Sequence, residues 1–255
     1  MRTAIVIPAR YASKRLPGKP LLRSTGKYLI EHVYERACQA RAASMVIVAT
    51  DDPRIASAVA GFGGNCVMTR RDHPSGTDRV AEVAGELDVD CVINLQGDEP
   101  EIAPSALDQL PALLDRDPTA GVATLAVPIM DEESYLDPNC VKVVCSDDGR
   151  ALYFSRSPIP HVRDGRPNFA ARPANFLQHV GLYAYRRDVL LRLAATSPVA
   201  LEGMEKLEQL RALAGGWAIQ VGVVNHAGRG VDTIADYQHF VAAYARRRRA
   251  RARAA

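Results

Sequence analysis

The sequence predicts an α/β fold built on a doubly wound, mostly parallel sheet. Through the first half of the chain, apolar runs of strand length alternate with segments whose apolar residues recur at helical spacing. The apolar runs are continuous, which is typical of strands that are buried on both faces. Strand-then-helix order repeated in this way favours a parallel sheet that carries helices on both faces.

The elements of the first half follow from these patterns in order. A helix is predicted over residues 29–37 because Leu29, Ile30, Val33 and Ala37 are spaced to share one face. The predicted strands cover residues 4–7, 45–49, 65–68 and 91–95, and further helices are predicted near 54–60, from Asp78 onward and after Pro104.

The second half of the chain has a more mixed pattern. The runs 141–144 and 151–154 flank a turn and predict a hairpin, while 179–185 and 219–224 predict further strands. We interpret the hairpin as a small subdomain inserted on the same sheet. A single domain over residues 1–245 is therefore expected, followed by a basic, disordered tail over residues 246–255.

The composition limits the class of protein and its partners. With 255 residues, of which 47% are hydrophobic and 24% charged, the chain is expected to be a soluble globular enzyme with a sizeable core. Its net charge of +3 depends on six arginines between Arg246 and Arg253, since 3 − 6 leaves −3 for the rest. No aromatic residue follows Tyr244, so we expect a solvated tail and no nucleic-acid partner.

Localisation and cysteine chemistry are also predicted from simple patterns. No apolar run approaches the roughly 20 residues that cross a bilayer, and the apolar stretch before Pro8 is too short for a signal peptide. We therefore expect a cytoplasmic protein without membrane insertion. The five cysteines contain no Cys-x-x-Cys pair, which indicates neither a disulfide framework nor a zinc site.

A basic loop follows the first predicted strand. Arg10, Lys14, Arg15 and Lys19 fall within ten residues directly after the apolar run 4–7. Prolines and a glycine inside the loop can hold it in one shape that aims the charges at a single anion. The glycine-rich dinucleotide fingerprint and the phosphate-loop motif are both absent. We therefore predict a polyphosphate cradle of another kind.

Ligands of a doubly wound sheet bind at the carboxyl ends of its strands, so we expect the loops after Ile7, Met68 and Leu95 to converge on one rim. Residues 163–173, which are rich in glycine, proline and arginine, are either a mobile lid over this site or an ordinary surface loop.

Two aspartates are candidate ligands of a magnesium ion. Asp98 follows a predicted strand and comes directly after Gly97, while Asp232 lies close behind Gly230. Two carboxylates from distant parts of a chain can hold magnesium between them and a substrate phosphate. An aspartate in such a position is also a common helix N-cap, and Asp232 precedes a predicted helix, so both interpretations stay open.

Seven segments, in order from about Thr3 to about Phe240, resemble those of the 3-deoxy-manno-octulosonate cytidylyltransferase (CMP-Kdo synthetase) family. The first of them is typical of the wider sugar nucleotidyltransferase group, whereas the Tyr-Phe-Ser-Arg, His-x-Gly-x-Tyr and Leu-Glu-Gln-Leu-Arg segments indicate the narrower family. The segments cover residues 8–20, 73–79, 94–100, 151–156, 179–183, 207–211 and 230–233.

The resemblance implies a Rossmann-like fold of the nucleotide-diphospho-sugar transferase type. It also implies transfer of the cytidylyl group of CTP to 3-deoxy-D-manno-octulosonate (Kdo), giving CMP-Kdo and pyrophosphate for the inner core of lipopolysaccharide, with Mg²⁺ as cofactor and a homodimer as the assembly. In-line displacement at phosphorus builds charge on phosphate oxygens, so positioning and electrostatics suffice and no protein nucleophile is expected.

The resemblance also assigns roles to individual residues. Arg10, Arg15, Lys19, Asp98 and Asp232 would be catalytic, the two aspartates as metal ligands. The nucleotide would contact Pro8, Ala9, Arg10, Lys19, Ser75, Gly76, Arg79 and Asp98, and the sugar acid would contact Gln96, Arg156, His179, Tyr183, Glu208 and Gln209.

Spacing adds two points to these roles. His179 and Tyr183 lie four positions apart on a predicted strand, which puts them on the same face. The run Ser75 to Asp78 also fits a turn in which Asp78 caps the next helix, and this interpretation is compatible with nucleotide contact.

Three positions depart from the family pattern. Tyr28 replaces an expected proline, the arginine tail exceeds the usual end, and Gly203-Met204 replaces more polar residues before Glu205. The third departure leaves 8-amino-Kdo open as the sugar, and a sialic acid is the other alternative. A regulator that has lost catalysis is a further alternative, against which stands the presence of Lys19 and both aspartates.

Overall fold

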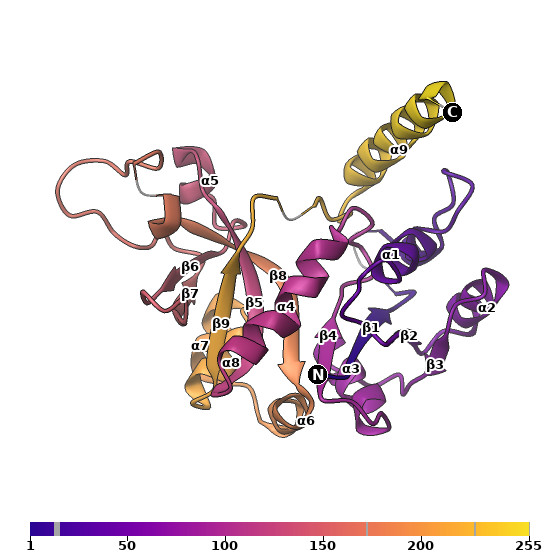
Figure 1. The fold of residues 1–255 in the computed structure, drawn as a ribbon, viewed down its shortest axis with the longest axis horizontal. Helices are drawn as coiled ribbons and strands as arrows, with labels where there is room; N and C mark the ends of the chain where they lie inside the picture. Colours follow the sequence, from indigo (N-terminus) through magenta and orange to yellow (C-terminus); the bar gives the residue numbers. More distant parts are fainter. Residues whose placement is uncertain (13–15, 172, 227, 255) are drawn as a thin grey trace. The chain divides into compact units, whose positions relative to one another are not determined.

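A computed structural model of the chain describes residues 1–12, 16–171, 173–226 and 228–254. The chain divides into two compact units, each described by itself below (Figure 1). The first unit contains Ala4–Glu86, Asn94–Pro104 and Gly228–Ala255; the second contains Met1–Thr3, Leu87–Ile93 and Ser105–Ala227.

The first unit has a parallel sheet core. Strand β1 (Thr3–Ala9) lies between its neighbours, pairing with β2 (Met45–Thr50), which pairs in turn with β3 (Cys66–Met68). All seven residues of β1 are buried, as its continuous apolar pattern predicts. On the other side of β1, Leu95 donates its N–H to the carbonyl of Val6 directly after β4 (Cys91–Asn94).

The helices of this unit begin close to the predicted positions. They are α1 (Leu29–Ala37), α2 (Pro53–Gly61), α3 (Gly76–Gly85) and α9 (Ile234–Ala254), with a short 3₁₀ turn, η1, at Lys19–Leu21. At the start of α2, Asp52 accepts a hydrogen bond from the Arg54 N–H and Pro53 occupies the first turn, which is a standard N-terminus.

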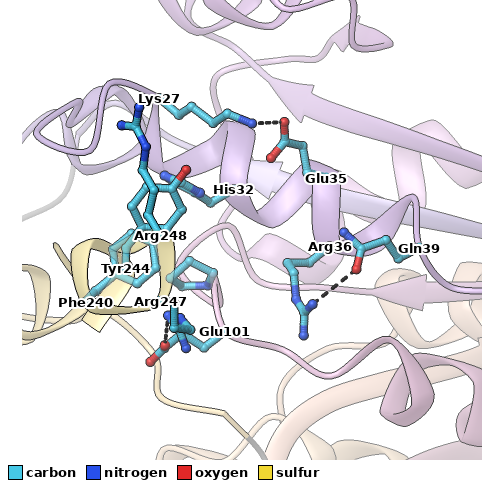
Figure 2. A pocket seen from close by; sticks show the side chains of 11 residues that line it. Lys27, His32, Glu35, Arg36, Gln39, Glu101, Phe240, Tyr244, Arg247 and Arg248 are labelled. Carbon is cyan, nitrogen blue, oxygen red and sulfur yellow. Dashed lines mark hydrogen bonds and ion pairs between the residues drawn. The ribbon is translucent and has the colours of Figure 1, made fainter. Parts of the chain in front are cut away.

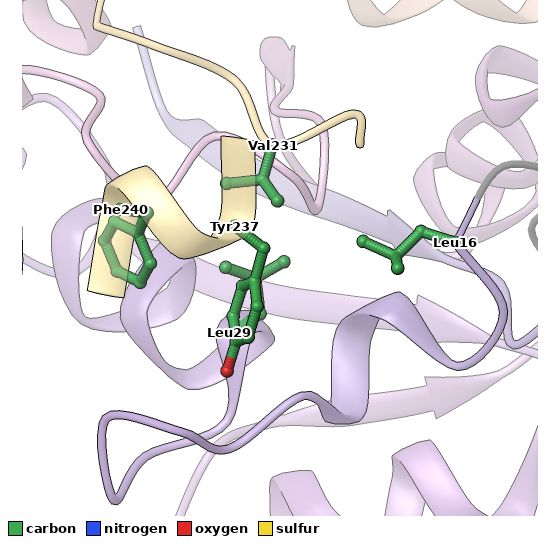
Figure 3. Packing of buried hydrophobic residues seen from close by; sticks show 5 residues of the cluster. All are labelled: Leu16, Leu29, Val231, Tyr237 and Phe240. Atoms are coloured by element: carbon green, nitrogen blue, oxygen red, sulfur yellow. The ribbon is translucent and has the colours of Figure 1, made fainter. Parts of the chain in front are cut away.

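Helix α9 packs against α1 through an apolar cluster (Figure 3). Leu29 of α1 and Leu16 of the loop after β1 meet Val231, Tyr237 and Phe240 from the carboxyl-terminal segment. This contact ties the end of the chain to its beginning. The boundary predicted at residue 245 falls inside α9, and the disorder predicted for residues 246–255 stays a prediction.

The second unit has a mixed sheet. Strand β5 (Ala120–Pro128) pairs antiparallel with β8 (Leu177–Arg186) and parallel with β9 (Ala218–Val223). The predicted hairpin is present as β6 (Lys142–Cys145) and β7 (Ala151–Ser155), and β6 continues the sheet beside β8. The helices are α4 (Pro104–Arg116), α5 (Glu132–Leu136), α6 (Arg187–Ala195), α7 (Ala200–Glu205) and α8 (Gln209–Ala214), with a 3₁₀ turn, η2, at Pro173–Asn175.

These pairings confirm the α/β class and a mostly parallel sheet. Strand β5 was not predicted. Its sequence is rich in alanine and contains a glycine, which are residue types depleted in strands, but both of its edges are paired and most of the strand is buried.

The segment 163–173 is held at one point by an apolar contact. Phe169 packs against a cluster formed by Ile129, Tyr135 and Phe176. Arg172 lies outside the described residues, and a lid role stays a prediction. No helix in the described part of the chain is both long and apolar enough to cross a membrane.

Two strand glycines make a matched stability test. A Cβ on Gly222 of β9 would come within 2.9 Å of Gln109 and Leu113 of α4, whereas a Cβ on Gly181 of β8 would meet nothing within 4 Å. We expect Gly222→Ala to lower the free energy of unfolding by about 1–3 kcal/mol through overpacking. Gly181→Ala should leave it unchanged or raise it by about 0.5 kcal/mol. Urea denaturation checks both, and equal effects of the two variants would contradict the packing of α4 on β9.

Candidate active site

The basic loop after β1 contacts the loop after β3. One guanidinium nitrogen of Arg10, Nη2, donates to the carbonyls of His73 and Ser75, both at 2.7 Å. Pro8 and Ala9 form the buried end of β1 immediately before it. Arg10 therefore links two of the three predicted loops, whereas Arg15 lies outside the described residues.

The ends of the basic loop are held by Tyr11 and Gly18. The Gly18 N–H donates to the Tyr11 carbonyl at 3.0 Å, and Gly18 has a φ of 68°, a conformation that favours glycine. The Arg54 guanidinium lies over the Tyr11 ring, 3.4 Å from its centroid, while two hydrogen bonds fix it on Asp52. This stack anchors the loop on the start of α2.

Lys19 meets both predicted metal ligands. Its ammonium lies 2.5 Å from Asp98 Oδ2 and 3.6 Å from Asp232 Oδ1, and it donates to the Val231 carbonyl at 2.9 Å. The Lys19 side chain is only 13% exposed, so the ion pairs are partly shielded from water. Residues from three distant parts of the chain thus converge at one point, as the sequence predicts.

The helix-cap alternative for Asp232 is wrong. Thr233 caps α9 instead, because its hydroxyl accepts from the Asp236 N–H at 3.2 Å and the Asp236 carboxylate accepts from the Thr233 N–H at 3.0 Å. Asp98 is likewise not a cap, since the next helix starts at Pro104. Both carboxylates therefore contact Lys19 without capping a helix.

A third carboxylate, Glu99, belongs to this group and was missed in the sequence. Burial raises the pKa of Glu99 to about 7, and the charges of Asp98 and Asp232 add to the effect while Lys19 opposes it. Gly230 leaves room for this side chain, because a Cβ there would come within 2.8 Å of Glu99 Oε1. In the sequence, Gly230 was the residue that could have indicated that another side chain packs closely against this segment.

Gly97 allows the loops after β1 and β4 to approach closely, because a Cβ there would come within 3.1 Å of the Pro8 carbonyl. Gly76 of the loop after β3 also lies beside Pro8, whose ring is 3.4 Å from the position of a Cβ on that glycine, which is an ordinary contact. The amide of Gln96, which follows β4, donates to Asn94 at 3.0 Å. The predicted convergence of the loops after β1, β3 and β4 is confirmed.

The start of α3 differs in detail from the sequence prediction. Ser75, not Asp78, is the N-cap residue, and its hydroxyl accepts from the Asp78 N–H. Asp78 occupies the third position and accepts from the Ser75 N–H at 3.0 Å, which completes a capping box. The helix consequently begins at Gly76, before the predicted start.

Arg79 is fully buried beneath this loop. It donates to the Thr69 hydroxyl, and its Nη2 lies 3.0 Å from Asp51 Oδ1 without the alignment of a hydrogen bond. Burial lowers the pKa of Arg79, Asp51 opposes this shift, and the nearby charge of Arg10 adds to it. The two arginines therefore give this end of the first unit a positive potential.

In the second unit, His179 and Tyr183 share one face of β8, as predicted. The register of β5 and β8 shifts between Thr124 and Leu125, and the Thr124 hydroxyl lies within hydrogen-bonding distance of His179 Nε2, at 3.1 Å. The His179 and Tyr183 rings are 5.3 Å apart, and Phe154 of β7 meets His179 edge-on at 5.0 Å. Burial lowers the pKa of His179 to about 3, so its imidazole is neutral at neutral pH.

Tyr183 also interacts electrostatically with Glu208, the residue directly before α8. Burial raises the pKa of Tyr183 well above its usual range, and Tyr185 and Glu208 add to that shift. Gln209, at the start of α8, is buried, and its Nε2 has no hydrogen-bond partner among the described residues. A buried amide donor left open in this way suits a polar ligand.

Arg156 is held mainly by backbone carbonyls. Its Nε donates to the Glu205 carbonyl at 2.6 Å and its Nη1 to the Pro138 carbonyl at 2.9 Å. The Glu205 carboxylate accepts from the Arg156 N–H and from the Ser155 hydroxyl. Met204, one of the departures from the family pattern, is 78% exposed.

The predicted residues thus fall into two groups. Pro8, Ala9, Arg10, Lys19, Ser75, Gly76, Arg79, Gln96, Asp98 and Asp232 belong to the first unit, and Arg156, His179, Tyr183, Glu208 and Gln209 to the second.

Comparison with known proteins agrees with the sequence resemblance. The cytidylyltransferase family description matches residues 4–219. The chain is 50% identical over 239 residues to a 3-deoxy-manno-octulosonate cytidylyltransferase of Syntrophotalea carbinolica, covering 92% of this chain and 96% of that one. It is 52% identical over 238 residues to the protein of that name from Pelobacter propionicus, covering 91% and 93%.

A solved structure agrees over the whole fold. The structure of CMP:2-keto-3-deoxy-manno-octonic acid synthetase complexed with CTP superposes with a TM-score of 0.90 and 48% identity, covering 97% of this chain and all of that one. A cytidylyltransferase from Leptospira borgpetersenii, at 16% identity and a TM-score of 0.63, covering 94% and 85%, shares the fold alone.

The raised pKa of Glu99 predicts a pH effect on stability. The folded state holds the proton of Glu99 up to about pH 7, whereas the unfolded chain releases it near 4.5. The stabilising contribution is complete below pH 4.5 and is lost as the pH rises to 7. The free energy of unfolding of the native chain should therefore fall, relative to that of Glu99→Gln, by on the order of 3 kcal/mol between pH 4.5 and 8.

Urea denaturation of both proteins without divalent metal, at several pH values, measures this difference. Titrating groups that do not interact with Glu99, such as His179, contribute equally to both proteins and cancel. Parallel pH profiles would contradict the shift.

Proposed function

Because the chain belongs to the 3-deoxy-manno-octulosonate cytidylyltransferase family, we propose that it transfers the cytidylyl group of CTP to Kdo, giving CMP-Kdo and pyrophosphate. The observation that carries this proposal is the convergence of Lys19, Asp98 and Asp232 behind the basic loop. One cation and two carboxylates, together with Arg10 of the same basic loop, suit a metal-bound triphosphate.

The donor set fits magnesium. Asp98 and Asp232 offer hard carboxylate oxygens on either side of Lys19, whose ammonium already takes a cation position between them. Although Glu99 lies near these two aspartates, no three acidic, histidine or cysteine side chains among the described residues are placed so that they could together hold a metal ion. Magnesium would therefore complete its coordination with phosphate oxygens and water, as it usually does, and would stabilise phosphate charge and acidify a hydroxyl.

The reaction needs little covalent help from the protein. The anomeric hydroxyl oxygen of Kdo forms a bond to the α-phosphorus, the bond from that phosphorus to the bridging oxygen breaks, and pyrophosphate leaves with the electron pair while the hydroxyl proton is released. Charge builds on the departing oxygens, where Arg10 and Lys19, both from the basic loop after β1, would supply positive charge. By family resemblance, Arg15 shares this role.

The nucleotide is proposed to contact backbone as well as side chains. Pro8 and Ala9 end the buried β1, and the glycine at Gly76 keeps the neighbouring surface free of a side chain. Ser75 turns its carbonyl to Arg10, which positions the loop for contact with the base. The fully buried Arg79 supports the loop from beneath and supplies positive potential.

The sugar acid is proposed to contact the residues named above from the resemblance. Arg156 offers a cation for the carboxylate, while Gln96, Glu208 and Gln209 offer groups for the hydroxyls. The neutral His179 and the protonated Tyr183 can each donate or accept one hydrogen bond without adding charge.

The setting of the reaction is also a proposal. We infer a cytoplasmic homodimer that supplies activated Kdo for lipopolysaccharide. The alternative sugars are 8-amino-Kdo and a sialic acid, and parallel assays with all three sugars decide between them.

The first functional prediction concerns metal and Asp98. Pyrophosphate release should require Kdo, CTP and Mg²⁺, and should be lost with UTP or with excess EDTA. Asp98→Asn should reduce kcat at least about a hundredfold, because an amide cannot balance the cation charge there. Glu101→Gln is the matched control on the same loop and should keep near-normal rates.

If a folded Asp98→Asn protein keeps a normal rate, Asp98 has no part in the mechanism. If activity survives complete removal of metal, the reaction does not require magnesium.

The second functional prediction concerns Gln209. Gln209→Leu removes a buried donor that has no partner in the described part of the chain, so we expect KM for Kdo to rise about tenfold, the equivalent of one hydrogen bond. KM for CTP should stay unchanged. Gln220→Leu is the control, because Gln220 also has a buried amide atom without a partner among described residues but no proposed role. Equal effects on both KM values would contradict a sugar contact.

A further inference from the structure

A cavity of about 420 Å³ lies between α1 and α9, outside the group formed by Lys19, Asp98 and Asp232 (Figure 2). Residues of α1 and its two flanking segments form one wall, and residues 240–248 of α9 form the other, while Pro100 and Glu101 of the loop after β4 also line it. All of these residues belong to the first unit.

The cavity carries a net positive charge. Four cations line it, namely Lys27, Arg36, Arg247 and Arg248, against two acids. Each acid is already in an ion pair, Glu35 with Lys27 and Glu101 with Arg247. The four cations and two acids of the lining thus give it a formal charge of +2.

Histidine does not alter this balance at neutral pH. Burial lowers the pKa of His32 to about 4, with Lys27 and Arg247 adding to the shift and Glu35 opposing it. His32 is therefore neutral, and it contacts the Thr25 hydroxyl through Nε2 at 2.7 Å.

The remaining cations differ in how they are held. Arg36 donates through Nε to the Ile102 carbonyl at 2.9 Å and through Nη1 to Gln39 at 3.2 Å. Arg248 forms no hydrogen bond or ion pair with any residue that the structure describes. Hydrogen bonds orient the guanidinium plane of Arg36, whereas Arg248 has no such bond within the described residues. Together the two side chains are suited to bind several oxygens of a phosphate chain.

Aromatic rings form the wall between these charges. Phe240 and Tyr244 of α9 both meet His32 edge-on, with centroids 5.0 and 4.8 Å away. An apolar wall lowers the local dielectric constant and so strengthens the attraction of the cations for an anion.

We propose that this cavity is a second anion site, which binds a small polyphosphate or a compound that carries one. The proposal does not depend on the cytidylyl transfer, because none of the residues assigned to CTP or Kdo lines the cavity. Its recognition elements are Arg36, Arg247 and Arg248, and Lys27 also lines the cavity.

Isothermal titration of the full chain with sodium tripolyphosphate, in the absence of divalent metal, tests this site. The titration uses a Lys19→Met background, which weakens binding at the basic loop so that the cavity dominates. We expect one binding event per chain in this background. Adding Arg247→Ala and Arg248→Ala together should weaken it at least tenfold.

Arg246→Ala is the matched control, since Arg246 is the neighbouring arginine of α9 and does not line the cavity. It should change the affinity less than twofold. No binding in the Lys19→Met background, or equal loss in both arginine variants, would overturn the proposal.

Circular dichroism verifies folding of every variant. If Lys19→Met does not fold, the arginine variants are compared in the otherwise native chain. In the native chain we expect two binding events for tripolyphosphate, one at the basic loop and one at the cavity. A tenfold weaker affinity of one of them in the Arg247→Ala, Arg248→Ala protein supports the proposal, and unchanged affinity of both overturns it.

Discussion

The ion pairs of Lys19 are the constraint on which the arrangement of the first unit depends. Lys19 is 79 residues from Asp98 and more than 200 from Asp232, yet its ammonium contacts both carboxylates. Two acids this close would repel one another and Glu99 without a counter-charge. The lysine therefore makes it possible for the loop after β4 and the segment before α9 to lie together before any ligand arrives.

Local interactions elsewhere support the contact of both acids with Lys19. Thr233 and Asp236 satisfy the start of α9 between themselves, so Asp232 need not cap the helix. The glycines at positions 97 and 230 replace side chains that would collide with the Pro8 carbonyl and with Glu99. Arg10 joins the loops after β1 and β3 through two carbonyls, which orders the rim without consuming a carboxylate.

The sequence predicts the first unit better than the second for a physical reason. In β1 and β2 continuous apolar runs are buried as predicted, and α2 and α3 have clear caps, so local pattern and burial agree there. The apolar run of β3 is the exception, because Val67 and Met68 are exposed. Strand β5 escaped prediction because alanine and glycine form a strand there only through pairing on both edges. The convergence of Lys19, Asp98 and Asp232 follows from topology and the resemblance, but Glu99 and the true cap Thr233 depend on side-chain packing that spacing alone does not specify.

Helix α9 and the segment before it contact one loop at two points. Just ahead of the first turn, the Val231 N–H donates to the Asp98 carbonyl at 2.8 Å, and about two thirds of the way along the helix Arg247 pairs with Glu101. The helix has 21 residues, so it is a rod about 30 Å long. Because the helix is attached to the same short segment at these two points, a change in its tilt would strain both contacts together. The arginine-rich end of the chain therefore has a mechanical connection to the carboxylates that its position in the sequence does not suggest.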